Sequence, residues 1–148
     1  MKVERIDHIH IAVKDMDKAV KFFSEVLGTK FSDAVEVPEF NIQGKLCPLG
    51  IELVTSTSTD GAVNQFIQRR GEGLYHVAFK VPDIEQAIAE LQSRGLRLIG
   101  REQIGNLKEA QFHPKDSFGV MIELAEYEDV HGAEVAAKSA PLPDQAVS

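Results

Sequence analysis

An internal repeat is the feature of this chain that most restricts its fold. The stretch DHIHIAVKDMDKAV, which begins at Asp7, aligns without a gap with YHVAFKVPDIEQAI, which begins at Tyr75. The alignment superposes His8 on His76, and the later segments GIELV and MIELA superpose Glu52 on Glu123. A chain that repeats itself in this way is expected to fold as two copies of one structural unit.

Each copy has the pattern of a βαβββ unit. In the first half, alternating residues 3–13 predict a strand, and an apolar stripe predicts a helix from Asp15 to about Leu27. The second half repeats the pattern with a strand over 74–81 and a helix over 83–94. Three short extended segments are expected to complete each half, at 31–37, 39–43 and 49–55 and at 97–104, 110–113 and 119–125.

Glycine and proline mark the expected ends of these elements. Gly28 and Gly95 follow the two helices, where a left-handed residue commonly ends an α-helix. Pro38, Gly44 and Pro48 are expected to separate the extended segments of the first half.

The predicted fold class is α+β: two tandem βαβββ modules that form one curved mixed sheet around a cavity. The modules span about 3–57 and 72–127, and residues 58–71 are expected to form a short helical connector. Together they make a single domain over 1–127. The segment 128–148 has little bulky apolar content, so a flexible tail is expected there.

Composition excludes several classes of function. The net charge of −7 argues against nucleic acid as a partner, because such binding needs a basic surface. The single Cys47 cannot form an intrachain disulfide. With neither a signal-peptide pattern nor an apolar run of about 18 residues, no membrane association and a cytoplasmic location are expected. An anionic small ligand is not excluded, since five cations could gather into a local basic patch: Arg69, Arg70, Lys80, Lys108 and Lys115.

Strand alternation predicts that four metal-ligand types share one surface. Side chains two residues apart lie on the same face of a strand. The apolar Ile9 and Ile11 are expected under the helices, which leaves His8 on the opposite, concave face. The same count places His76, Glu52 and Glu123 on that face.

These four residues suit a divalent metal ion. Two imidazoles and two carboxylates form a site for Co, Ni, Mn, Fe or Zn and leave positions for water or a bidentate substrate. One histidine or glutamate on a strand is more often a surface or hydrogen-bonded residue than a ligand. Repetition of the set in both halves favours the metal site. His113 and His131 are expected to have structural or solvated roles.

The chain resembles the vicinal oxygen chelate superfamily, and within it most closely the methylmalonyl-CoA epimerases. The resemblance covers about 3–127 and rests on the opening DHIHIAVKDMDKAVKFFSEVLG, the central RGEGLYHVAFKV and the closing FHPKDSFGVMIEL. By resemblance, a metal is held at the positions of His8, Glu52, His76 and Glu123. These are the residues that the repeat also indicates.

The resemblance also implies a reaction and its partners. A metal-dependent epimerase would interconvert the C2 epimers of methylmalonyl-CoA by proton abstraction next to the thioester, through a metal-stabilised enolate, with Glu123 as ligand and base. The acyl-CoA phosphates would meet Lys108 and Lys115, and a homodimer is expected. Open alternatives are a glyoxalase-I-like lyase or isomerase of a hemithioacetal, another metal-dependent enzyme of the superfamily such as a dioxygenase, and a non-catalytic binding module.

Three positions depart from the epimerase pattern. His10 stands where a small residue is usual, and it points into the same cavity. It is a candidate acid–base group, a support for a ligand, or a core histidine. Tyr75 replaces a common histidine before the second-half ligand. A second acid–base group has no clear match, and Glu36 and Glu39 are the nearby candidates.

Overall fold

The protein is described by a computed structural model over residues 1–128. Its eight strands form one mixed sheet in the order β2-β3-β4-β1-β5-β8-β7-β6. The elements are β1 (Arg5–Ala12), α1 (Met16–Leu27), β2 (Val35–Val37), the 3₁₀ helix η1 (Pro38–Phe40), β3 (Ile42–Cys47), β4 (Ile51–Ser56), α2 (Ala62–Arg70), β5 (Gly73–Lys80), α3 (Ile84–Ser93), β6 (Leu98–Ile104), β7 (Leu107–Phe112), the 3₁₀ helix η2 (Pro114–Asp116) and β8 (Met121–Glu126).

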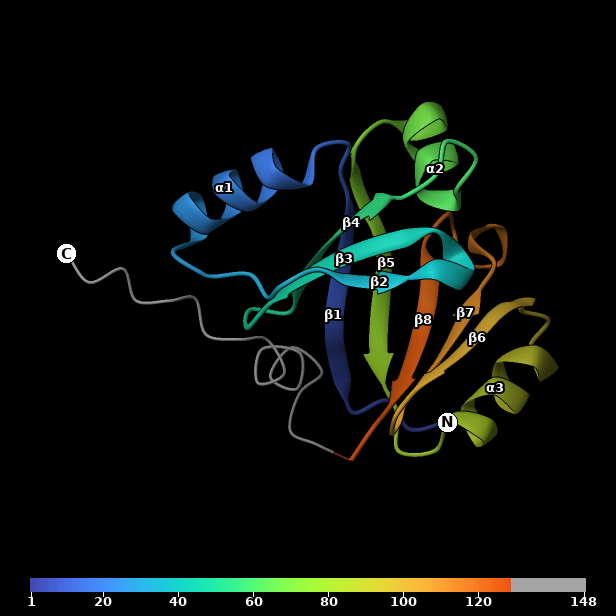
Figure 1. Cartoon of the computed structure of the whole chain (residues 1–148). Helices are drawn as coiled ribbons and strands as arrows, with labels where there is room; N and C mark the ends of the chain where they lie inside the picture. Colours follow the sequence, from blue (N-terminus) through green and yellow to red (C-terminus); the bar gives the residue numbers. More distant parts are fainter. Residues whose placement is uncertain (129–148) are drawn as a thin grey trace.

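The two modules meet along the antiparallel pair β1–β5 at the centre of the sheet. On each side of this seam, the first strand of a module pairs in parallel with the last, β1 with β4 and β5 with β8. The remaining strands continue outward in antiparallel hairpins. Figure 1 shows the sheet curled, so that β2 and β3 cross in front of the central strands. The predicted α+β fold of two βαβββ modules around a curved mixed sheet is confirmed.

The helices α1 and α3 cover the outer face of the sheet at its two ends (Figure 1). Under α3 lies the largest core cluster, in which Phe112, Leu124 and Val81 are almost fully buried. Leu53 and Val13 pack against the apolar stripe of α1. The third cluster joins α2 to the strands β1 and β4. The inner face carries the polar side chains of the central strands beside apolar residues, such as Ile42 and Val54, that line the same cavity.

Both long helices begin and end where the sequence predicts. The carboxylate of Asp15 accepts a hydrogen bond from the Lys18 N–H at 3.1 Å, and Asp83 accepts one from the Gln86 N–H at 2.9 Å. Such caps satisfy backbone donors that the first turn of a helix leaves free. Gly28 ends α1 in the left-handed conformation, with φ of 62°.

The first half differs from the prediction around Gly44. This glycine does not separate two strands but lies inside β3, and Pro38–Phe40, at the start of the segment predicted as strand from residue 39, forms the 3₁₀ helix η1. Strand β2 is also shorter than predicted. In the second half, β7 begins at Leu107 rather than Ala110. The last point matters for the site, because it adds Glu109 to a strand.

Further expectations concern Cys47, membrane-spanning helices and the C-terminal tail. Cys47 is buried and free, as expected of a small apolar residue. Within residues 1–128, none of the helices has the length and apolar character needed to span a bilayer. The predicted flexible tail and His131 lie outside the described residues, apart from Glu128.

Candidate metal centre

The four residues that the repeat singles out converge on the inner face of the sheet. They come from the four central strands, two from each module. Strand register explains the convergence, because directly opposite residues lie about 5 Å apart. Two rows cross the sheet: Glu52–His10–His76, and His8–Ala78–Glu123.

Short distances join the functional atoms of this set. The Nε2 atom of His8 lies 3.6 Å from Glu52 Oε2 and 3.5 Å from Glu123 Oε1. The Nδ1 atom of His76 lies 3.5 Å from Glu123 Oε2. His8, His76 and Glu123 are buried, whereas the side chain of Glu52 is 23% exposed. The site is therefore closed at the sheet and open toward Glu52.

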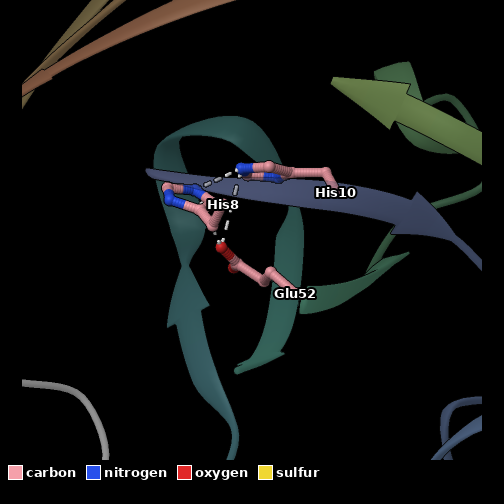
Figure 2. Close-up of side chains that lie close together, drawn as sticks. All are labelled: His8, His10 and Glu52. Atoms are coloured by element: carbon pink, nitrogen blue, oxygen red, sulfur yellow. Dashed lines mark hydrogen bonds and ion pairs between the residues drawn. The ribbon is translucent and has the colours of Figure 1, made fainter. Parts of the chain in front are cut away.

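His10 belongs to the same group of side chains. Its Nε2 lies 2.7 Å from His8 Nε2, and 3.4 Å and 3.6 Å from the carboxylates of Glu123 and Glu52. Figure 2 shows His8 and His10 projecting from β1 toward Glu52. We call His8, His10, Glu52, His76 and Glu123 the His/Glu cluster. The sequence departure at His10 thus adds a third imidazole beside the four predicted ligands.

A second layer of hydrogen bonds orients His8. Its Nδ1 donates to Asp7 Oδ2 at 2.8 Å, which turns Nε2 toward the cluster. The hydroxyl of Tyr127 donates to the other oxygen of Asp7 and accepts from Arg5 Nη2 at 2.8 Å. Burial lowers the pKa of His8, but the hydrogen bond to Asp7 and the charge of Glu123 outweigh it and raise that pKa well above 6.5.

Replacing Asp7 by Ala is expected to weaken binding of a divalent metal about 10- to 100-fold, because His8 loses the partner that fixes its tautomer and ring. Asp7→Asn, which keeps an acceptor, should lose less. Metal competition titrations measure the effect. The matched control is Asp15→Ala, which removes a carboxylate from the α1 cap at a cost of about 1 kcal/mol in stability. Equal metal affinity for wild type and Asp7→Ala would contradict the role of Asp7.

Several atoms of the cluster are buried without a hydrogen-bond partner. They are both ring nitrogens of His76 and Oε1 of Glu123. Burying such atoms unpaired costs free energy, so they indicate a position that a ligand fills. Sets of three donors, such as His10, His76 and Glu123, lie with all their ligand atoms within 4.8 Å of one another. The residues present therefore fit a divalent ion.

The protonation states of Glu123 and His76 suit the same ion, whereas His8, whose pKa is raised, releases a proton when its Nε2 binds a metal. Burial opposes the ionisation of Glu123, yet its contacts with His10, His76 and His8 hold its pKa well below the usual value. Burial lowers the pKa of His76. An anionic carboxylate and a neutral imidazole are the forms that bind metals.

Gly44 leaves room for Glu52. A Cβ atom at this position would lie 2.2 Å from Glu52 Oε1. Gly44→Ala is therefore expected to push the Glu52 carboxylate aside and to weaken metal binding about tenfold. The same titration checks this, with Lys45→Ala on the neighbouring residue of β3 as the control. Unchanged affinity in Gly44→Ala would indicate that Glu52 does not hold the metal.

The cluster lies in a cavity of about 340 Å³, which we call the first cavity. Its wall includes Glu109, Gln111 and Glu102, which the sequence interpretation missed. Gln111 Nε2 donates to Glu123 Oε2 at 3.0 Å. Burial and the charge of Glu123 raise the pKa of Glu109 well above its usual value. A strand begun at Leu107 would have placed Glu109 and Gln111 on the inner face by alternation.

Lys108, predicted as a phosphate partner, is placed elsewhere. It follows Leu107 and precedes Glu109, both of which line the cavity, so its side chain leaves the opposite face of β7. There its Nζ donates to Glu126 Oε1 at 2.7 Å. His113 accepts a hydrogen bond from the Lys115 N–H at the start of η2, which is the structural role expected of it.

Comparison with known proteins identifies the family. The family model of the Glyoxalase/Bleomycin resistance protein/Dioxygenase superfamily matches residues 7–112. The chain belongs to this superfamily. It is 34% identical over 130 residues to the mitochondrial methylmalonyl-CoA epimerase of Mus musculus, and the alignment covers 83% of this chain and 73% of the relative.

Solved structures of the superfamily share the fold of this chain. Methylmalonyl-CoA epimerase from Mycobacterium tuberculosis superposes with a TM-score of 0.78 at 27% identity, covering 86% of this chain and 90% of the other. A methylmalonyl-CoA epimerase in complex with methylmalonyl-CoA and NH4+ gives 0.79 at 27% identity, covering 88% and 99%. The enzyme type predicted from the sequence, an isomerase of the epimerase type, is confirmed. The homodimer stays a prediction.

Proposed function

We propose that this superfamily member is a metal-dependent epimerase that interconverts the two C2 epimers of methylmalonyl-CoA. The observation that carries the proposal is the set of unpartnered ligand atoms on His76 and Glu123, gathered with His8 and Glu52 in one cavity. The relatives named above act as epimerases, which supports this reaction over others of the superfamily.

His8, Glu52, His76 and Glu123 would hold the ion, with His10 close enough to serve as a further donor. The donor set suits Co, Ni, Mn, Fe or Zn. A bound divalent ion would polarise the thioester carbonyl and so acidify the C2 hydrogen. Asp7 keeps His8 in the tautomer that this arrangement needs.

The remaining chemistry is proton transfer by carboxylates. Epimerisation removes a proton from one face of C2 and returns one to the other, so it needs two acid–base groups. Glu123 would serve one face. For the other we propose Glu39, an exposed residue of η1 at the rim of the first cavity, because Val37 and Phe40 near it in the chain line that cavity. The pKa of Glu102 in the cavity is raised by burial, and then by the charges of Glu123 and Glu39.

Glu36, the other candidate from the sequence, is less suited to act as the second acid–base group because its side chain faces away from the first cavity. It alternates with Val35 and Val37, both of which line the first cavity, so it projects from the other face of β2. There it accepts a hydrogen bond from Gln43 Nε2 at 3.3 Å.

Deuterium incorporation at C2 of methylmalonyl-CoA in heavy water tests the proposal. Metal-loaded protein is expected to exchange this hydrogen far above the uncatalysed rate. Chelation should abolish the exchange and metal addition should restore it, while His76→Ala should lack it. Background exchange in protein that demonstrably holds its metal would exclude the epimerase, and hemithioacetals would be tested next.

A further inference from the structure

We infer that Arg69, Arg70 and Lys115 bind the phosphate groups of the acyl-CoA in a second cavity that continues from the first. The inference rests on the proposed function, because it concerns the distal end of the same substrate. It replaces Lys108, whose side chain is turned away and paired with Glu126. The proposed phosphate site thus combines the two arginines at the end of α2 with Lys115 of η2, which follows β7.

The second cavity adjoins the metal-site cavity. Its volume is about 600 Å³. Four residues line both cavities: Ala62, Tyr75, Ile99 and Met121. Tyr75 stacks on His76, with ring centroids 3.9 Å apart, and so stands between the metal ligands and the second cavity. A ligand with its reactive end at the cluster can therefore extend past Tyr75 and Met121 into the second cavity.

The two cavities carry opposite kinds of charge. Carboxylates line the first, namely Asp7, Glu52, Glu102, Glu109 and Glu123. Among the described residues, the wall of the second contains neither Asp nor Glu, but it contains three cations and His113. The chain as a whole has a net charge of −7, so this gathering of positive charge departs from its composition. A cavity with this lining favours an anionic group.

The three cations lack carboxylate partners within residues 1–128. Among the described residues, the one hydrogen bond of the Arg70 side chain is to a backbone carbonyl: its Nη1 donates to Gly119 O at 3.4 Å. Asp116 could have neutralised Lys115, but both of its oxygens accept from Arg97, at 2.9 Å each. Arg69 and Arg70 interact favourably with the dipole of α2, because they lie in its last turn. The helix dipole does not explain Lys115, which comes from η2. Guanidinium groups bind phosphate oxygens in pairs of hydrogen bonds.

The spacing suits a CoA thioester. From Glu123 back to Gly119, where Arg70 contacts the chain, there are four residues along β8 and its approach, or roughly 13 Å at the strand rise. The pantetheine arm of CoA, with two amides between the sulfur and the diphosphate, spans a similar length. The thioester can thus lie at the metal site while the diphosphate and 3′-phosphate reach the arginines.

The test compares two substrates on one set of variants. Arg69→Glu/Arg70→Glu and Lys115→Glu are assayed with methylmalonyl-CoA and with methylmalonyl-pantetheine, which lacks all phosphates. The ratio of kcat/KM for the CoA substrate to that for the pantetheine substrate is expected to fall at least about tenfold in each variant, as for loss of one charged hydrogen bond. Lys21→Glu, which makes the same charge change on the exposed face of α1, is the control and should keep the wild-type ratio.

Direct binding separates this inference from the proposed reaction. Calorimetry with free CoA, performed without turnover, should show binding that weakens with salt and in both variants, and much weaker binding of pantetheine. If epimerisation fails but this pattern holds, the phosphate site stands without the reaction. An unchanged substrate ratio in active variants, or equal CoA affinity in wild type and Arg69→Glu/Arg70→Glu, would overturn the inference.

Discussion

Glu123→Gln is expected to lower the rate of C2 exchange about 100- to 10,000-fold, the range for loss of a positioned acid–base group. The substitution keeps the size of the side chain but removes the charge that meets three imidazoles. Because Glu123 would also hold the metal, the affinity for the ion should fall in the same variant. Exchange assays at saturating metal separate the two effects.

The matched control for Glu123→Gln is Glu25→Gln, the same change on the exposed side of α1. It should leave exchange and metal affinity at wild-type values. If Glu123→Gln retained wild-type exchange once saturated with metal, Glu123 would be a ligand at most, and proton transfer would belong to other carboxylates of the first cavity.

Phe112→Ala is expected to lower the free energy of unfolding by about 3–5 kcal/mol. Phe112 is fully buried beneath α3, where a truncated side chain leaves a cavity that surrounding residues fill only in part. Urea titration followed by circular dichroism measures the change. The site should lose its metal in the same transition, since β7 and β8 carry both the core and part of the cluster.

Phe22→Ala makes the same chemical change on the outer side of α1, where Phe22 is 57% exposed. Its effect should stay below about 1 kcal/mol, because little apolar surface leaves water there on folding. Equal destabilisation by the two substitutions would mean that the cluster under α3 is not the main core.

The repeat predicted the fold and the meeting of the four cluster residues because both depend on periodicity. Alternation fixed the face of His8, and duplication placed a like residue, His76, on the matching strand. The helix caps at Asp15 and Asp83 are equally local, since each contact spans three residues. Features of this kind can be predicted from the sequence because they depend on residues only a few positions apart in the chain.

The supporting residues could not be predicted, because their contacts join distant segments. Asp7 meets Tyr127 across 120 residues, and only the folded sheet brings them together. Gly44 looked like a strand end because glycine is common in turns, whereas its role is to admit Glu52. The role of Lys108 was predicted wrongly because β7 begins three residues earlier than expected. Lys108 therefore lies inside this strand, where its side chain leaves the face opposite the cavity.

The division of the cluster between the two modules has a consequence for how the enzyme is made. Each half of the chain supplies two of the four predicted ligands, and the seam between β1 and β5 joins segments that lie far apart in sequence. Contacts between such distant segments carry a cost in loop-closure entropy, which slows folding. A bound ion would link the two modules across the seam, so the free energy of unfolding would rise with the concentration of free metal.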